Sequence, residues 1–99
     1  MHRINTADLR ELEVINLCGG ERLGYPCDFE IDIADARILS IIVEKNDGGF
    51  TLFSGKEQYV IPWCYIECIG EDAILVKLDS AKLGECFCVD RRKKRQKCK

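Results

Sequence analysis

The sequence predicts an all-β protein: a small, mainly antiparallel β-barrel with a short N-terminal helical turn and a flexible basic C-terminal tail. Two observations support this prediction. Short segments rich in branched and aromatic residues follow one another closely, with Gly, Asn and Asp turns between them. Several segments also alternate apolar and polar residues, which is the period of a strand with one buried face. Closing such a sheet into a barrel removes the edges that a small β protein otherwise exposes.

The N-terminal part predicts one helical turn and one strand, followed by a bend. Thr6 offers an N-cap for a short helix-forming run. Residues 13–17 have the composition of a strand, which the turn at 18–20 ends. Gly24 and Pro26 then indicate a bulge, or a bend at a sheet edge, because proline cannot donate a ladder hydrogen bond.

Residues 28–33 show the clearest alternation in the chain. Its apolar side chains are expected on the core and its carboxylates in solvent; the two sets are Phe29, Ile31 and Ile33, and Asp28, Glu30 and Asp32. The carboxylates do not predict a cation site, because alternate residues of a flat strand spread over about 13 Å, too far to close one coordination shell. We interpret them as a solvated acidic face that can attract the basic tail.

The remaining elements of the barrel follow in order along the chain. They are a strand at 37–45 that is buried on most sides, a turn at 46–49, a hairpin of strands at 50–53 and 57–63, a helical turn at 64–72 and a strand at 73–78. Tyr59, Ile61 and Trp63 share one face of their strand, so Tyr59 and Trp63 are predicted to lie in the core, although aromatic residues also anchor interfaces. In the last strand the inward residues are Ile74, Val76 and Leu78.

Three of these segments together resemble the PRC-barrel family, and within it the sporulation group of YlmC and YmxH. They read "LRELEVINLCGGERLG", "DFEIDIADARILSIIV" and "YVIPWCYIECIGEDAILV", and the resemblance covers about residues 3–79. One departure lies in the hairpin after the acidic strand, where the family usually carries Thr-Gly and this chain has Asp35 and Ala36. Because Ala tolerates a positive φ poorly, we expect this turn to differ locally from the family.

The resemblance implies a PRC-barrel domain at residues 1–79 and a C-terminal extension at 80–99. Within the extension, residues 84–89 are as compatible with one added strand as with no strand, and residues 91–99 form the basic tail. PRC-barrels resemble binding modules, since related domains occur in a ribosome maturation factor and in a photosynthetic reaction-centre subunit. The sporulation group implies an endospore-forming bacterium, but family analogy supplies no reaction.

Composition predicts a cytoplasmic protein with reduced thiols. The start has no apolar core of a signal peptide, and no apolar run approaches the roughly 20 residues that span a bilayer. The odd count of 7 cysteines argues against a secreted disulfide framework. No cofactor is expected, because no P-loop or dinucleotide fingerprint is present.

The cysteines are the nearest candidates for a metal site. The closest pairs are Cys64 with Cys68, which would share one face of a helical turn, and Cys86 with Cys88. Neither pair has the spacing of a zinc knuckle or ribbon, so no metal site is predicted. We interpret Cys64 and Cys68 as small, partly buried fillers beside Trp63, with metal binding and redox chemistry as open alternatives. A catalytic Cys–His pair is not expected, because the only histidine is His2 near the terminus.

The tail "RRKKRQKCK" is the strongest charge feature. It holds seven of the 15 Lys and Arg residues and none of the 17 acidic residues, so residues 1–90 carry a balance of −9. Its candidate anion-binding or nucleic-acid-binding residues are Arg91, Arg92, Lys93, Lys94, Arg95, Lys97 and Lys99. A solvated tail, contact with RNA or the ribosome, and contact with an anionic membrane surface all stay open.

These observations predict a non-catalytic binding or scaffold module that engages a protein partner or a second copy of itself. The alternative is an RNA- or ribosome-associated accessory protein that works through residues 91–99. An enzyme with a small-molecule substrate is not expected, since no set of acid, base and nucleophile can be assembled.

Overall fold

The structure is a computed structural model that describes residues 3–45 and 56–90. The predicted turn at 46–49, the strand at 50–53 and the basic tail at 91–99 lie outside the described residues.

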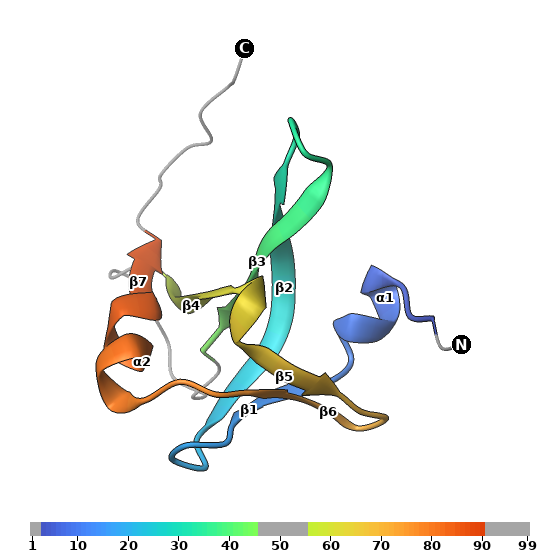
Figure 1. Ribbon diagram of the computed structural model, residues 1–99. Coiled ribbons are helices and arrows are strands. Elements are labelled where there is room, and N and C mark those ends of the chain that lie inside the picture. Colours follow the sequence, from blue (N-terminus) through green and yellow to red (C-terminus); the bar gives the residue numbers. More distant parts are fainter. Residues whose placement is uncertain (1–2, 46–55, 91–99) are drawn as a thin grey trace.

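Within the described residues, seven strands form one curved sheet in the order β5-β6-β1-β2-β3-β4-β7 (Figure 1). The strands are β1 (Glu13–Asn16), β2 (Arg22–Asp32), β3 (Arg37–Glu44), β4 (Lys56–Pro62), β5 (Ile66–Ile69), β6 (Ala73–Val76) and β7 (Phe87–Asp90). The short helical elements are α1 (Thr6–Leu9), the 3-10 turn η1 (Trp63–Tyr65) and α2 (Ser80–Cys86). Neighbouring strands run antiparallel, except that β1 and β6 are parallel. The predicted all-β, mainly antiparallel class is confirmed.

The first helical turn begins one residue earlier than predicted. Asn5, not Thr6, is the N-cap of α1, because the Asn5 side chain accepts a hydrogen bond from the Asp8 amide at 2.9 Å. The Asp8 carboxylate accepts from the Asn5 amide in return, at 3.4 Å. This reciprocal capping box satisfies two backbone donors that a helix end leaves unpaired.

The predicted bend in β2 is confirmed and joins the two halves of the sheet. Gly24 has φ +124°, and a Cβ atom there would lie 2.4 Å from the carbonyl oxygen of Glu44. The strand pairing shifts register on both sides of this point, once along β1 and once between Pro26 and Asp28 along β3. Up to Gly24, β2 pairs with β1; from Tyr25 onward it pairs with β3. Glycine is required where backbones approach this closely.

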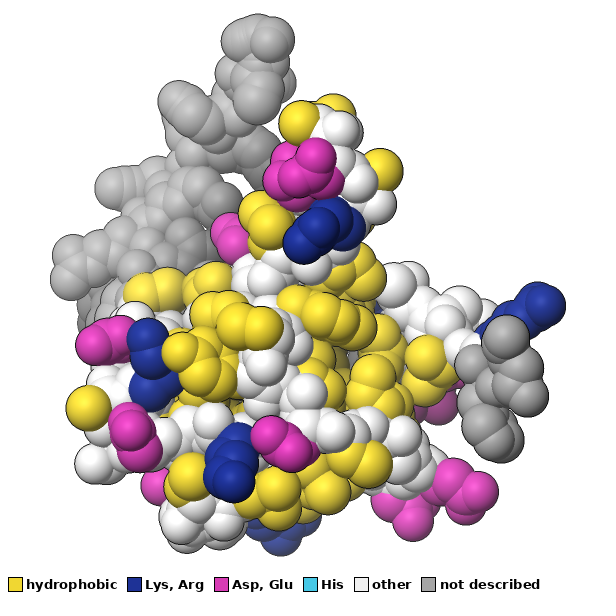
Figure 2. All heavy atoms as spheres, in the orientation of Figure 1, with side chains coloured by type: hydrophobic (Ala, Val, Ile, Leu, Met, Phe, Trp, Pro, Cys, Tyr) yellow, Lys and Arg dark blue, Asp and Glu magenta, His cyan; other side chains and the backbone are white. Residues whose placement is uncertain are grey.

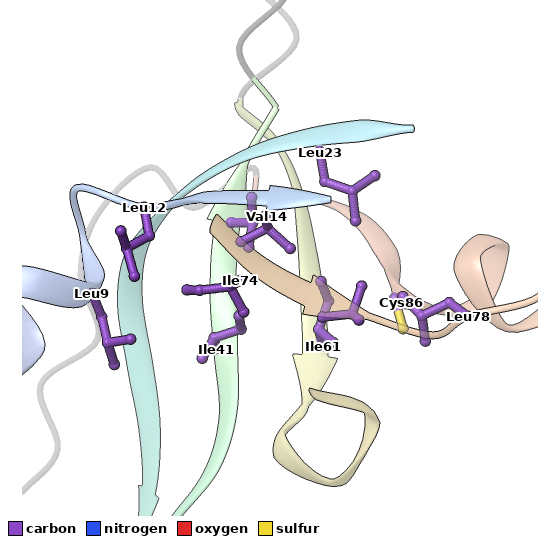
Figure 3. Packing of buried hydrophobic residues seen from close by; sticks show 11 residues of the cluster. Leu9, Leu12, Val14, Leu23, Ile41, Ile61, Ile74, Leu78 and Cys86 are labelled. Atoms are coloured by element: carbon purple, nitrogen blue, oxygen red, sulfur yellow. The ribbon is translucent and has the colours of Figure 1, made fainter. Parts of the chain in front are cut away.

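The core lies between the two halves of the curved sheet (Figure 3). Its members are Leu9, Leu12, Val14, Leu23, Ile41, Val43, Ile61, Ile74, Val76, Leu78 and Cys86. Tyr59 and Trp63 are partly buried and pack against this cluster, as predicted from the strand face that they share with Ile61. The prediction of inward residues in the last strand is also confirmed, because Ile74, Val76 and Leu78 are at most 1% exposed.

The alternation of residues 28–33 predicts the strand correctly, but two of its three apolar residues lie outside the core. Phe29 packs against the core, whereas Ile31 is 60% exposed and Ile33 is 89% exposed. The reason is that the β2–β3 hairpin projects beyond the rest of the sheet (Figure 1). Pairing of β3 with β4 reaches only to Ser40, so nothing in the described structure covers the tip. Leu39, also beyond this limit, is 48% exposed, so β3 is not buried on most sides at this end.

Residues 64–72 form less helix and more strand than predicted. The helical turn is limited to η1, and the chain then extends into β5, which pairs with β6. The open edge of β6 offers backbone partners to Ile66, Cys68 and Ile69, which a single isolated helical turn cannot match. Tertiary pairing thus overrides the local signal.

The C-terminal extension folds as a helix and a strand. Asp79 caps α2 by accepting a hydrogen bond from the Lys82 amide at 2.8 Å. The following strand, β7, pairs with β4. This pairing places the Phe87 ring edge-on to the Tyr59 ring, with 5.5 Å between the ring centroids. The sequence left a strand at 84–89 undecided, and the structure has a strand at Phe87–Asp90.

Candidate protein interface

Five apolar residues of the projecting hairpin form a surface that we call the hairpin apolar face. Its members are Phe29, Ile31, Ile33, Ile38 and Leu39. In Figure 2, apolar side chains lie on the projecting hairpin, among acidic and basic ones, and on the body of the molecule below it. Exposed isoleucine in a run of this kind is typical of an interaction surface.

Strand register explains why these residues share one side of the hairpin. Phe29 lies opposite the buried Ile41, and Ile31 lies opposite Ile38. Side chains two positions apart on a strand point to the same face, so the hairpin apolar face continues the core face beyond the point where the core ends. A register shift next to Ile31 adds Leu39 as an extra residue.

A shallow groove of about 380 Å³ lies beside this surface. It runs between the start of β3 and the start of η1, and its lining residues are Arg37, Ile38, Leu39, Pro62, Trp63 and Cys64. The Trp63 side chain supplies a large aromatic wall, and Arg37 places one positive charge at the rim. A flat indole beside an exposed aliphatic surface is a common anchor for protein partners.

The carboxylates of β2 lie on the opposite side of the hairpin and make local hydrogen bonds. Glu30 accepts from the Ser40 hydroxyl at 2.6 Å, and Asp28 accepts from the amide of the next residue at 2.9 Å. Asp32 closes the turn by accepting from the amides of Ala34 and Asp35, at 3.0 and 3.4 Å. Asp28 and Glu30 stay exposed, so this side of the hairpin presents negative charge to solvent.

In the turn of the hairpin, Ala36 adopts the left-handed backbone conformation that usually requires glycine. Ala36 has φ +57°, the only positive φ at a non-glycine residue among those described. The turn therefore accepts the strain of an alanine in this conformation. That this turn differs locally from the family stays a prediction.

A second, larger groove of about 710 Å³ lies between α1 and the β5–β6 turn. It is lined by Arg3, Ile4, Asp8, Glu11, Leu12, Ile69, Gly70, Glu71 and Asp72. Ile4, Leu12 and Ile69 are its apolar members, and four carboxylates surround them. The groove is therefore negatively charged, whereas the tail at 91–99 is positively charged.

The cysteines of the candidate metal pairs do not gather. Cys64 and Cys68 lie on η1 and β5 and are exposed, so their interpretation as partly buried fillers is wrong. They share no helical face, because the chain is extended from Ile66 onward. Cys86 is buried and Cys88 exposed, and burial raises the pKa of the Cys86 thiol. Within residues 3–45 and 56–90, no three His, Cys, Asp or Glu side chains stand close enough to hold a metal ion.

The comparisons with known proteins identify the fold family. The family model described as PRC-barrel domain matches residues 1–83. The chain belongs to the PRC-barrel family. It is 36% identical over 75 residues to "Probable sporulation protein YlmC" of Bacillus subtilis, a match that covers 76% of this chain and 93% of that relative. It is also 36% identical over 80 residues to an uncharacterized protein of Clostridium acetobutylicum, covering 80% of this chain and 87% of that relative.

These matches confirm the resemblance to the sporulation group of the PRC-barrel family. The family model extends into α2, whereas the two relatives match over 75 and 80 residues. Among the described residues, no helix of this PRC-barrel chain has the length and apolar character needed to cross a membrane.

Sequence reasoning missed the contribution of Ile38, Leu39 and Arg37 to an exposed surface. The available signal was an apolar alternation that continued up to the turn at 33–36. The tip of a long hairpin is the part of a sheet that a small core covers least, so apolar residues at such a tip indicate an interface.

Proposed function

We propose that this PRC-barrel protein is a non-catalytic binding or scaffold module of the sporulation type, and that its hairpin apolar face engages a protein partner or a second copy of the chain. The observation that carries the proposal is the exposure of Ile31 on the same face as the buried Ile41, with the exposed Ile33 in the turn that follows. Burying these two side chains against a partner contributes on the order of 1.5–3 kcal/mol for each of them.

Two features support a role in binding rather than catalysis. The projecting hairpin places apolar side chains and the Trp63 groove on one continuous surface. The sequence also offers no set of acid, base and nucleophile, since its only histidine is His2 near the terminus. The relationship to a probable sporulation protein suggests that the partner is present in sporulating cells.

The test is capture of partners from sporulating cells with matched surface variants. We expect Ile31→Lys and Ile33→Lys to lose the captured protein, because a lysine cannot be buried in an apolar contact without a large cost. Leu17→Lys is the control, since Leu17 is 50% exposed and lies in the turn after β1, away from the hairpin. Light scattering of the purified chain separates self-association from a different partner. A partner that all three variants retain equally, with a monomeric chain, would contradict the proposal.

A second function is favoured by the composition of the tail. Seven basic residues in 91–99 can neutralise phosphate groups, which gives salt-dependent binding without sequence selectivity. In this alternative the protein accompanies RNA or the ribosome. We expect removal of residues 91–99 to abolish retention on RNA, and we expect the retention of the whole chain to fall steeply with salt. Retention that survives the deletion would count against this function.

A further inference from the structure

We propose that the outer edge of β2 takes up an extended segment of a protein partner in which apolar and basic residues alternate, as one additional strand of the sheet. This inference rests on the proposed function and names the chemistry of the partner. It concerns the part of β2 that lies beyond its pairing with β1.

Along the hairpin, no described strand pairs with the outer side of β2. The pairing of β1 with β2 ends at Gly24, and from Asp28 to Asp32 the described strand that pairs with β2 is β3 alone. A strand with one neighbour turns half of its backbone donors and acceptors outward, and these groups are a template for another strand. In Figure 1 this edge of the hairpin rises clear of α1.

The two faces of this edge differ in character. One face carries Phe29 and Ile31, with Ile33 in the turn that follows, and the other face carries Asp28, Glu30 and Asp32. Side chains directly opposite one another on paired strands lie about 4.5–5.5 Å apart at Cβ, close enough for apolar contact on one face and ion pairing on the other. A strand that alternates apolar and basic residues satisfies both faces at once.

A second copy of β2 fits this edge poorly. It would place the same three carboxylates of a neighbouring chain against Asp28, Glu30 and Asp32, and like charges directly opposite one another destabilise a strand pair. Charged residues on an open edge are a common protection against pairing between identical chains. The acidic face therefore selects for a basic partner strand and against self-pairing.

The chain's own tail also fits poorly. It is basic at seven of nine positions and has no apolar alternation, so it offers charge to the acidic face but nothing to the isoleucines. A segment of another protein that alternates apolar and basic residues matches both the isoleucines and the acidic face.

The test uses synthetic peptides of about nine residues, which span about 30 Å as strands and so cover the exposed part of β2. One peptide alternates Val and Lys, the second has the same composition in two blocks, and the third alternates Val and Glu. We expect the alternating Val–Lys peptide to bind the full chain roughly tenfold more tightly than either of the others. Its binding should also slow hydrogen exchange at the amides of β2 between Tyr25 and Asp32.

Two exposed positions supply variants that keep the fold. Ile31→Thr should weaken binding of the Val–Lys peptide roughly tenfold, because it removes apolar contact at a side chain that is 60% exposed in the free protein. Asp28→Lys should shift the preference toward the Val–Glu peptide, because it reverses one charge on the acidic face.

The outcomes separate this inference from the function on which it rests. Equal binding of the alternating and block peptides would show attraction by charge alone and would overturn strand addition. So would binding that leaves exchange at the β2 amides unchanged. If the peptides show no preference while Ile31→Lys still abolishes capture of the cellular partner, the hairpin remains an interface and only the added strand is wrong.

Discussion

The side chain of Asn16 pairs with the backbone of Leu78 through both of its polar atoms. Asn16 Oδ1 accepts from the Leu78 amide at 2.9 Å, and Asn16 Nδ2 donates to the Leu78 carbonyl at 2.9 Å. The same Nδ2 donates to the Glu21 carboxylate at 2.8 Å. Because Asn16 is 1% exposed, these bonds join the end of β1 to the chain that leaves β6 in the absence of competing water.

Asn16→Ala should lower the free energy of unfolding by about 3 kcal/mol, because the Leu78 amide and carbonyl are left buried without partners. Urea unfolding followed by fluorescence measures the change. Asn5→Ala is the matched control, since it removes an exposed helix cap that contributes about 1 kcal/mol. Equal losses for the two variants would contradict the role of Asn16.

Gly24→Ala should destabilise the fold by about 2 kcal/mol or more. The new Cβ atom would collide with the Glu44 carbonyl, and φ +124° is strained for any side chain. Gly84→Ala is the opposite case, because Gly84 lies in α2 with open space around its Cα. We expect a gain of about 0.5–1 kcal/mol there from higher helix propensity. Thermal unfolding of both variants measures this difference in sign.

Ala36→Gly should stabilise the protein by about 1 kcal/mol, because glycine adopts φ +57° without the steric cost that alanine carries. Ala34→Gly, two residues earlier in the same turn, should be neutral or destabilising, since it adds only freedom to the unfolded chain. Chemical denaturation compares the pair. A gain at Ala34 and none at Ala36 would show that the backbone angle of the turn is not what limits its stability.

The buried thiol of Cys86 should make stability depend on alkaline pH. Burial raises the pKa of Cys86 above its ordinary value of 9.0, so the folded protein holds this proton more firmly than the unfolded chain does. The contribution is complete below the unfolded pKa and is lost as the pH rises through the folded pKa. Between about pH 8 and about pH 10, stability should fall more steeply in the natural chain than in Cys86→Ala. Equal slopes would show that the thiol titrates alike in both states.

The sequence predicted the fold class and most strands because those depend on alternation and turn chemistry, which are local. It placed Ile74 and Val76 inside correctly, since a strand in the middle of a sheet buries its apolar face. It failed at Ile31 and Ile33, because alternation assigns a face but not the distance to which the core extends along it. That distance depends on where β4 stops pairing with β3, a non-local property.

The candidate site was less accessible to sequence reasoning than the fold. Cys64 and Cys68 attracted attention by their spacing, but their positions depend on whether the chain after Tyr65 stays helical or pairs with β6. The pairing of Asn16 with Leu78 links residues 62 positions apart, and no local pattern announces it. Both relationships arise only when distant strands meet.

Photo-crosslinking in sporulating cells tests the role of the hairpin most directly. A photoreactive amino acid would replace Ile33, which is 89% exposed at the hairpin tip, or Leu17, which is 50% exposed after β1. We expect a discrete adduct with a protein partner, or with a second copy of this chain, from position 33 and little or none from position 17. Adducts of equal yield at both positions, or an adduct at Leu17 alone, would contradict the assignment of the hairpin apolar face as the binding surface.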